Sequence, residues 1–485
     1  MGHAVSVPLW LFLVLVALAA WATLVLLLVP GMRWYFRSRV NRVIAQLNRR
    51  LPVALPSFKL TRRQVLIDRL FHDAKVQAAA AAHSRESREP IAETWRRVDR
   101  YAREIVPSFN AYIYFRVGYA LARSSARLMY RVRVGYLDEV ALARVAPESS
   151  IVFVMNHRSN MDYVLVAFLA AERVALSYAV GEWARVWPLQ QLIRAMGAFF
   201  VRRNSGDPLY RVVLARYVAM ATEAGVPQAM FPEGGLTLDG GLRAPKFGLL
   251  DYMLKGFDER EGEGRRDLVF IPVGLNYDRV LEDRSQLGKL HPDLPRPGRL
   301  RALGTTLSFA GRNLWQMVTG EWHRFGYACV NFGTPLSMRE LSRTQGWDFH
   351  AMDETTRRSV VPEVARSLME AIGSVIPVLP VSLVASLMVE TPERAWSELE
   401  LKAAALARMA EFEAAGAHAY IPRRDQDYAF GVGLRMLLLR RLVEEKDGLY
   451  RPMTSDVEVL RYYSNAIEHL PRGQGLASAA IIAPT

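Results

Sequence analysis

The sequence IVFVMNHRSNMD, residues 151–162, decides the fold class of this chain of 485 residues. Its first five residues are apolar and mostly β-branched, which predicts a buried strand. Residues 163–172 follow with the apolar spacing of a helix. In open α/β sheets ligands gather beyond the carboxyl ends of strands, where the polar segment NHRSN lies. The stretch therefore predicts a strand–loop–helix unit with a polar site in its loop.

The same alternation continues on both sides of this unit. Apolar or alternating runs predict strands at residues 132–136, 174–180, 228–231, 268–273 and 327–332, and helical spacing is found at 163–172, 183–196 and 209–224. A strand is expected to end at Gly274, and a turn is expected at Gly197. Strands that alternate with helices favour an α/β fold with a mixed, largely parallel sheet flanked by helices.

Composition excludes several classes of protein. Hydrophobic residues make up 51% of the chain and charged residues 23%, which excludes a disordered or collagen-like protein. The net charge of +14 leaves nucleic acid, an anionic membrane or an anionic substrate as partners. The single cysteine, Cys329, excludes an internal disulfide and lies in an apolar run, where we expect it to fill the core.

The N-terminal segment predicts a membrane anchor. Residues 7–30 are 24 residues without a charge, and a spanning helix needs about 20. Nine Lys or Arg and no acid follow between Gly31 and Ile67, so the positive-inside rule predicts a single-pass inner (plasma) membrane protein with a cytoplasmic body. The alternative is a buried hairpin of a soluble protein.

Changes in composition predict five regions: a transmembrane anchor at 1–31, a basic juxtamembrane helical region at 32–128, an α/β domain at 129–375, an α-helical C-terminal region at 376–470 and a flexible tail at 471–485. Helices are expected in the C-terminal region at 399–414 and 434–445. A helix expected at 302–318 can lie on the membrane or pack in the core, and both alternatives remain open.

The strongest chemical signal is the pair His157 and Asp162, an H-x4-D spacing in the loop after the first strand. The aspartate can accept a hydrogen bond from one ring nitrogen and fix the tautomer. The other ring nitrogen can then remove a proton from a hydroxyl. The alternative is a structural histidine at a strand end, held by a nearby carboxylate.

Three further blocks follow in order. With the His157–Asp162 pair as the first block, the second block is GAFFVRR at 197–203, whose paired arginines suit phosphate. The third block is FPEGG at 231–235, followed by Arg243 and Lys246, and the fourth is IPVG at 271–274. Taken singly, an arginine pair is usually a solvated face, Gly-Gly is usually a turn, and Ile-Pro is usually a strand end.

The four blocks together resemble the glycerolipid acyltransferase superfamily, whose blocks are H-x4-D, G-x-x-F-(I/V)-x-R, F-x-E-G and a strand with (I/V)-P. HRSNMDY at 157–163 and the second block are most similar to the glycerol-3-phosphate and dihydroxyacetone-phosphate acyltransferase group. PVSLVA at 380–385 and LRYYSNAI at 460–467 resemble the C-terminal helical segments of that group. The resemblance covers residues 95–470. One departure is LTLD at 236–239, where the family usually has an arginine-serine-arginine stretch.

The resemblance implies an O-acyltransferase that moves a fatty acyl group from acyl-CoA or acyl-carrier protein to glycerol 3-phosphate, the first step of phospholipid synthesis. It implies His157 as the general base and Asp162 as the residue that orients it. The implied substrate-binding residues are Arg158, Gly197, Phe199, Arg202, Arg203, Glu233, Gly234, Gly235, Arg243, Lys246 and Pro272. Among these, the four basic residues at 202, 203, 243 and 246 are expected to bind phosphate, and the glycine N–H groups at 234 and 235 an oxyanion.

No metal or cofactor is expected, and the expected partners are a lipid membrane, the acyl donor and the phosphorylated acceptor. One alternative is a 1-acylglycerol-3-phosphate acyltransferase or an enzyme for another hydroxyl acceptor, because the third block lacks its arginine. The alternative from another class is a membrane-tethered basic protein that binds nucleic acid. Only the net charge supports it, since the sequence has no zinc knuckle or aromatic RNA-binding motif.

Overall fold

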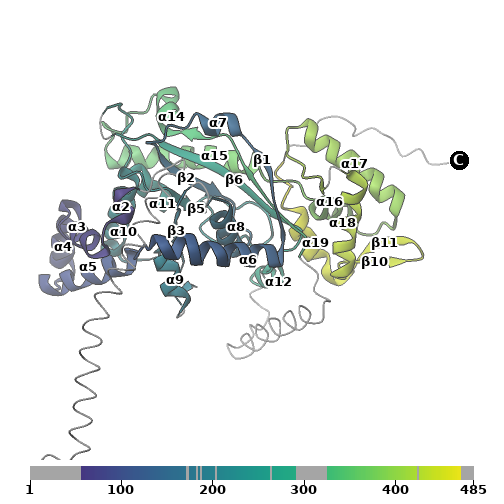
Figure 1. Ribbon diagram of the computed structural model, residues 1–485, viewed down its shortest axis with the longest axis horizontal. Helices are drawn as coiled ribbons and strands as arrows, with labels where there is room; N and C mark the ends of the chain where they lie inside the picture. The colour runs from purple at the N-terminus through teal and green to yellow at the C-terminus, as the bar shows by residue number, and fades with distance from the viewer. Residues whose placement is uncertain are drawn as a thin grey trace, which may run out of the picture.

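The computed structural model describes residues 56–170, 174–181, 184–185, 188–202, 205–262, 265–290, 325–422 and 425–470. Its centre is an eight-stranded sheet in the order β1-β7-β6-β2-β5-β3-β4, with β8 paired to β6 (Figure 1). The strands are β1 (Arg131–Leu137), β2 (Ser150–Met155), β3 (Ser177–Val180), β4 (Phe199–Phe200), β5 (Gln228–Met230), β6 (Leu268–Tyr277), β7 (Tyr327–Phe332) and β8 (Leu336–Ser337).

The sheet is mixed and mostly parallel. β6 runs antiparallel to β7 and β8, and the other neighbours are parallel. At its centre Val154 of β2 lies between Met230 of β5 and Pro272 of β6. The predicted α/β class with a largely parallel sheet flanked by helices is therefore confirmed.

Strand β2 shows why both faces of the sheet are covered. All six of its residues are buried, as expected of a parallel strand between two helical layers. Residues 151, 153 and 155 pack in one hydrophobic cluster with α8 (Met161–Ala170) and α16 (Pro380–Glu390). Val152 and Val154 pack in a second cluster with α10 (Pro208–Glu223), α11 (Gly248–Leu254) and α15 (Glu354–Ser374). The period of two along the strand thus divides the core into two layers.

The N-terminal helices contribute to both layers of the core. They are α2 (Ser57–Leu60), α3 (Arg63–Phe71), α4 (Ala74–Ser87), α5 (Ile91–Ile105), the π-helix η1 (Ile113–Gly118) and α6 (Tyr119–Met129). The helices α3, α4 and α5 pack on α10, whereas α6 packs on α8. Short helices complete the domain: α7 (Glu139–Ala143), α9 (Leu189–Ala195), α12 (Asp283–Leu287) and α14 (Met338–Gln345). The predicted helix at 183–196 is therefore shorter than expected within the described residues.

The C-terminal helices α16, α17 (Glu398–Ala414), α18 (Gln426–Leu439) and α19 (Val457–Ser464) lie together at one end of the sheet (Figure 1). The short 3-10 helix η4 (Thr454–Asp456) leads into α19. A small antiparallel sheet accompanies them, formed by β9 (Trp396–Ser397), β10 (Val443–Lys446) and β11 (Leu449–Pro452).

The predicted helix at 434–445 is wrong in its second half. Helix α18 ends at Leu439, and Asp447-Gly448 connects β10 to β11 with φ values of 55° and 72°. Asp-Gly is a preferred pair for such a two-residue hairpin turn, so the local turn signal overrides the helical spacing.

Several predictions fall on residues outside the described ranges: the anchor at 7–30, the helix at 302–318, the tail at 471–485 and Arg203. Within the described part of the chain, no helix is both long and apolar enough to cross a membrane. The five domain boundaries stay predictions. Cys329 is fully buried in β7, as expected of a core residue.

Candidate active site

The loop between β2 and α8 brings His157 and Asp162 together. The imidazole Nδ1 lies 2.9 Å from Asp162 Oδ2. His157 is 2% exposed and Asp162 is fully buried. The histidine follows the end of β2 and the aspartate lies in the first turn of α8, so the strand–loop–helix unit itself produces the pair.

Both oxygens of the Asp162 carboxylate accept further hydrogen bonds. Oδ2 also accepts the backbone N–H groups of Arg158 at 2.8 Å and Ser159 at 3.0 Å. Oδ1 accepts the hydroxyl of Tyr277, which is the last residue of β6. Burial and the Asp162 charge raise the pKa of the Tyr277 phenol well above its usual range, so it stays a donor. A carboxylate surrounded by donors is an acceptor only, which assigns the proton between the pair to His157 Nδ1.

Aromatic side chains fix the plane of the imidazole. The His157 ring stacks on Phe231 with a centroid distance of 3.9 Å and an interplanar angle of 24°. Tyr163 meets it edge-on, with a centroid distance of 5.5 Å. No hydrogen bond joins Nε2 to another residue of the described ranges. Nε2 is therefore the ring nitrogen that can accept a proton.

Glu233 connects the dyad loop to the third block. Its Oε1 accepts the N–H of His157 at 2.9 Å, and its Oε2 accepts the N–H of Arg243 at 3.2 Å. Burial raises the pKa of Glu233 to about 8, and this effect exceeds the lowering of the pKa by the two backbone donors. Both carboxylate oxygens accept backbone N–H groups, so Glu233 holds together the two loops that carry these groups.

The two glycines after Glu233 differ in whether their N–H group already makes a hydrogen bond. The N–H of Gly234 donates to Phe231 O at 3.0 Å, so the turn already uses it. The N–H of Gly235, a buried residue, makes no hydrogen bond to the rest of the described chain. The expectation that both N–H groups are available for an oxyanion is therefore wrong for Gly234.

The segment at 236–241, which replaces the family's arginine stretch, docks on the C-terminal helix α19. Thr237 N–H donates to His157 O at 2.8 Å, and the Asn465 side chain donates to Asp239 O at 3.0 Å. Gly240 has a φ of 89°, and a Cβ on it would lie 1.8 Å from Tyr462 O. This loop therefore needs glycine at position 240 and holds the dyad loop against α19.

Arg158 also turns toward α19. Its guanidinium lies 5.2 Å from the centre of the Tyr462 ring, and its Nη2 donates to Tyr462 O at 3.4 Å. It is 2% exposed and forms no ion pair with a described residue. A second contact holds the same loop from the start of α12, where the N-cap residue Glu282 accepts Ser159 Oγ at 2.8 Å and Asn160 Nδ2 at 2.9 Å.

Comparison with known proteins agrees with this geometry. Residues 138–276 match the family model described as "Acyltransferase". Residues 138–276 form an acyltransferase domain. Residues 313–484 match the model described as "Glycerol-3-phosphate acyltransferase C-terminal region". The resemblance found in the four sequence blocks is thereby confirmed.

Curated proteins named "Glycerol-3-phosphate acyltransferase" are similar over most of the chain. The protein of Xylella fastidiosa (strain M12) is 27% identical over 372 residues, which cover 75% of this chain and 41% of that protein. The protein of Pseudomonas entomophila (strain L48) is 27% identical over 463 residues, which cover 90% of this chain and 52% of that protein. The chain thus spans about half or less of the length of these relatives.

A solved structure, the 1-acyl-sn-glycerophosphate acyltransferase of Thermotoga maritima, has 16% sequence identity and a TM-score of 0.30. The similarity covers 64% of this chain and 97% of that one. It is too low to support a conclusion.

Within the acyltransferase domain, Arg202 lies apart from the dyad. It follows β4, three strands from β2, which corresponds to roughly 14 Å at the usual strand spacing. Its guanidinium binds Glu104 of α5 through two contacts, of 2.9 Å and 2.5 Å. The rings of Tyr101 and Tyr210 flank it, with centroid distances of 5.0 Å and 4.9 Å. The Arg202 guanidinium is therefore already paired with a carboxylate.

Arg243 and Lys246 lie beside the Glu233 turn. Arg243 donates from Nη1 to Leu236 O at 2.9 Å, and no carboxylate of the described residues pairs with it. The Lys246 stem covers Gly234, while its side chain is exposed. Of the predicted phosphate-binding residues, these two are the ones that the structure brings to the dyad loop.

The remaining predicted residues are parts of the scaffold. Gly197 forms the turn before β4 with a φ of 87°, as predicted, and Phe199 is buried against Tyr217. Pro272 lies inside β6, which continues to Tyr277, so the predicted strand end at Gly274 is wrong. The proline is tolerated because β8 pairs with residues 269–270 and β7 begins to pair at Val273, which leaves position 272 between them.

Three residues that contact the dyad or its loop, Tyr277, Thr237 and Glu282, were not predicted from the sequence. The signal for Tyr277 was the continued apolar run of β6, which the glycine at 274 obscured. Thr237 and Glu282 reach the dyad loop only through the tertiary fold, so no local sequence pattern predicts their contacts.

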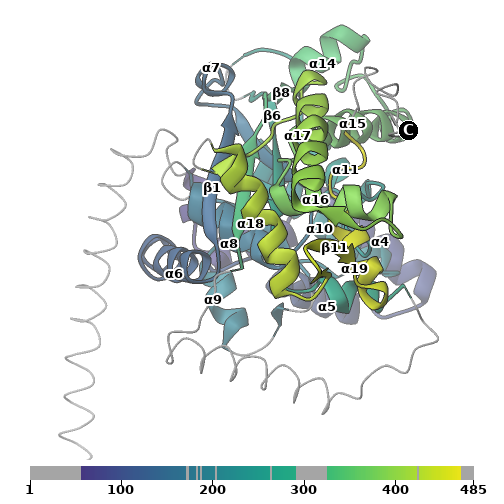
Figure 2. The same ribbon diagram turned by 90° about the vertical axis from the view of Figure 1, so that its right-hand side faces the viewer.

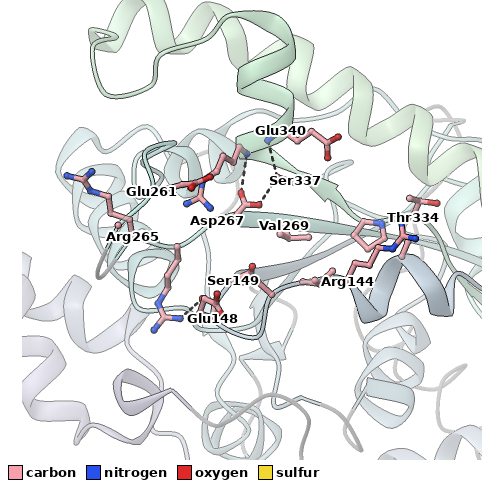
Figure 3. Close-up of a pocket in the computed structure, with 17 residues that line it drawn as sticks. Arg144, Glu148, Ser149, Glu261, Arg265, Asp267, Val269, Thr334, Ser337 and Glu340 are labelled. Carbon is pink, nitrogen blue, oxygen red and sulfur yellow. Dashed lines mark hydrogen bonds between the residues drawn. The ribbon is translucent and has the colours of Figure 1, made fainter.

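A cavity of 670 Å³ lies at the amino ends of β2 and β6, opposite to the strand ends that the dyad follows (Figure 3). Its walls include Arg144, Ser149 before β2, Asp267 before β6 and Ser337. Asp267 accepts Ser337 Oγ at 2.6 Å and Arg339 N at 3.1 Å, so much of its polar lining is bonded internally. The cavity is separate from the dyad, which follows the carboxyl end of β2. Among the described residues, no group of three His, Cys, Asp or Glu side chains is arranged to hold a metal ion.

Proposed function

We propose that this chain transfers a fatty acyl group from a thioester, acyl-CoA or acyl-carrier protein, to a hydroxyl of glycerol 3-phosphate. The observation that carries the proposal is the state of the His157 ring. Its Nδ1 is bound to a fully buried carboxylate, and its Nε2 makes no hydrogen bond to a described residue. This is the arrangement that a general base for an alcohol requires.

In the proposed reaction Nε2 accepts the proton of the acceptor hydroxyl as its oxygen attacks the thioester carbonyl. The resulting tetrahedral intermediate collapses, and its C–S bond breaks. The proton on Nε2 passes to the departing thiolate, so the products are an ester and a free thiol. The imidazole ends neutral, and no cofactor is consumed.

Asp162 has two roles in this proposal. It holds the Nδ1–H tautomer, and it stabilises the imidazolium that forms during attack. Its bonds to Arg158 N, Ser159 N and the Tyr277 hydroxyl keep it from rotating. A fixed carboxylate needs no reorganisation when charge develops on the ring.

The oxyanion requires donors close to the dyad. The Gly235 N–H is the backbone donor of the third block that no described acceptor occupies. Because Glu233 ties this turn to His157 N–H, the donor is held in a constant position relative to the base. We assign Gly235 N–H to the oxyanion.

The acceptor phosphate is assigned to Arg243 and Lys246. Both border the turn that Glu233 links to the dyad, and neither is neutralised by a carboxylate of the described residues. Arg202 is paired with Glu104 and lies three strands away. Because the 236–241 loop fills the place of the family's arginine stretch, 1-acylglycerol 3-phosphate stays a second candidate acceptor.

The membrane expectations belong to the same proposal. Residues 7–30 would anchor the chain in the inner membrane, with the basic residues from Arg33 onward and the catalytic body in the cytoplasm. A reporter fused after Arg50 should be inaccessible from outside the cell. A reporter exposed outside would overturn this topology.

The acyl transfer is tested with membranes that contain the full chain. Acyl-CoA and acyl-carrier protein are each crossed with glycerol 3-phosphate, dihydroxyacetone phosphate, 1-acylglycerol 3-phosphate and glycerol. The proposal expects a thiol and an ester from glycerol 3-phosphate, and little from glycerol, which lacks the phosphate. Preference for 1-acylglycerol 3-phosphate would select the second candidate, and no transfer to any acceptor would refute the function.

A further inference from the structure

The region between Glu104 and Asp138 is free of acidic residues and contains five arginines. It forms η1, α6 and β1, which follow one another along the chain. All charged side chains that this stretch contributes to the surface are therefore positive. Such a surface attracts polyanions and anionic membranes.

Helix α6 packs through one side only. Its small residues Ala122 and Ala126 are buried, and the helix lies along α8, whose first turn carries Asp162. The opposite side carries exposed apolar residues, with Val117 of η1 at 40% and Leu121 at 50% exposure. They are four residues apart, so they are neighbours on the surface of the helical segment.

A row of arginines accompanies these apolar side chains. Arg116, Arg123 and Arg127 are exposed, and their spacing of seven and four residues aligns them along the helix. None of the three forms a salt bridge with a residue of the described ranges. The guanidinium of Arg127 lies over the ring of Phe168, 5.6 Å from the centroid. In contrast, Arg202 and Arg440 are paired with Glu104 and Asp283.

This surface lies on the same side of the molecule as α12 (Figure 1), as expected for an enzyme that takes its substrate from a membrane. In both views α6 and α9 lie at the lower side of the molecule, and α7 and α14 lie at the upper side (Figures 1 and 2). α12, which follows the carboxyl end of β6, lies on the same side as α6. Helix α6 therefore lies on the side of the molecule where α12 follows the carboxyl end of β6 (Figure 1).

We propose that this surface, the α6 face (Arg116, Val117, Leu121, Arg123 and Arg127), lies on an anionic lipid bilayer. Val117 and Leu121 would enter the boundary between headgroups and acyl chains, and the arginines would contact lipid phosphates. Apolar residues beside a basic row are typical of helices that lie in a membrane interface. A nucleic acid would use the arginines and leave the apolar pair in water. The inference does not depend on the acyltransferase activity.

The arginine row should make binding depend on lipid charge. Each Lys or Arg near an anionic surface contributes about 1 kcal/mol, so three correspond to an affinity difference of roughly 150-fold. Replacement of all three arginines by glutamine should therefore weaken contact of the α6 face with anionic vesicles. It should have little effect on contact with vesicles of phosphatidylcholine alone.

The test uses the full chain, reconstituted in vesicles of phosphatidylglycerol and phosphatidylcholine. The native Cys329 is fully buried, so an introduced surface cysteine can be labelled selectively with an environment-sensitive fluorophore, and the unsubstituted chain measures the background. Leu121→Cys reports on the α6 face. Val140→Cys is the matched control, since Val140 is 66% exposed and lies on α7 at the opposite side.

Nitroxide-labelled phosphatidylcholine should quench most of the Leu121→Cys emission and little of the Val140→Cys emission. The quenching at position 121 should fall when the three arginines are replaced or when phosphatidylglycerol is omitted. Equal quenching at the two positions would overturn the proposal. A label at 121 that is shielded from aqueous iodide, yet is not quenched by the lipid nitroxide, would also overturn it, because another part of the protein would then cover the face.

Discussion

Replacement of Tyr277 by phenylalanine tests whether the dyad depends on the buried contacts of Asp162. The phenol donates to Asp162 Oδ1, which receives no other hydrogen bond from a described residue. A hydrogen bond to a charged group contributes about 1.5–3 kcal/mol. Since 1.36 kcal/mol is tenfold in rate, Tyr277→Phe should lower kcat by about 10- to 100-fold. The KM for the acceptor should change little, because the phenol is buried behind the dyad.

Tyr130→Phe is the control for this variant. Tyr130 is also buried, and its ring packs against Tyr277 with a centroid distance of 5.3 Å. Its hydroxyl donates instead to Arg279 O, at 2.9 Å. Loss of either hydroxyl should lower the free energy of unfolding by about 1–3 kcal/mol. Both variants should therefore lose stability, but only Tyr277→Phe should lower kcat per folded molecule.

Positioning and general destabilisation are separated by comparing kcat with the KM for the acceptor, each measured per folded molecule. Tyr277→Phe should lower kcat and leave KM in place, because Asp162 would no longer be held in the orientation that His157 needs. Tyr130→Phe should change neither, and equal kcat values for the two variants would refute the role assigned to Tyr277.

Further predictions concern the surrounding residues. Arg243→Gln should raise the KM for glycerol 3-phosphate by about tenfold or more, because a charged contact with the phosphate is lost. Arg202→Gln should raise this KM less, since Arg202 is paired with Glu104. Steady-state kinetics of the two variants test this, and a larger effect of Arg202→Gln would place the phosphate at β4. Glu233 has a folded pKa of about 8, above its unfolded value of 4.5, so its contribution to stability should be lost as pH rises from about 4.5 to 8. Thermal unfolding across this range should show a steeper decline in the unsubstituted chain than in Glu233→Gln, and parallel curves would contradict the assignment. Gly240→Ala should destabilise the protein by more than about 2 kcal/mol and reduce activity. The new Cβ would clash with Tyr462 O, and the backbone at this position has a positive φ. A variant with normal stability and activity would show that the loop does not depend on α19.

Most of the sheet could be predicted from local patterns. β2 and β7 contain short apolar runs, at 151–155 and 327–330, and α10 has Asp207 as its N-cap and Pro208 in its first turn. Such signals act within a few residues, so the sequence contains them directly. The hairpin at Asp447-Gly448 was missed because helical apolar spacing outweighed a correct turn signal.

The dyad could be predicted because both of its members lie in one strand–loop–helix unit. The surrounding contacts could not, since they depend on tertiary packing. Asp162 meets Tyr277 from a strand 115 positions away in sequence, and Arg158 meets Tyr462 across 304 positions. The pairing of Arg202 with Glu104 likewise needs α5 to pack beside β4, which no local pattern specifies.

The measurement that tests the central claim most directly is the specific activity of His157→Ala, normalised to folded protein in the membrane. Removal of a general base should lower turnover by about 10²- to 10⁴-fold, while the variant remains folded. If His157 were only a structural residue of the strand end, its loss would instead reduce stability by about 1–3 kcal/mol and leave turnover per folded molecule intact. Near-normal turnover by this measure would contradict the acyl-transfer mechanism derived from the dyad.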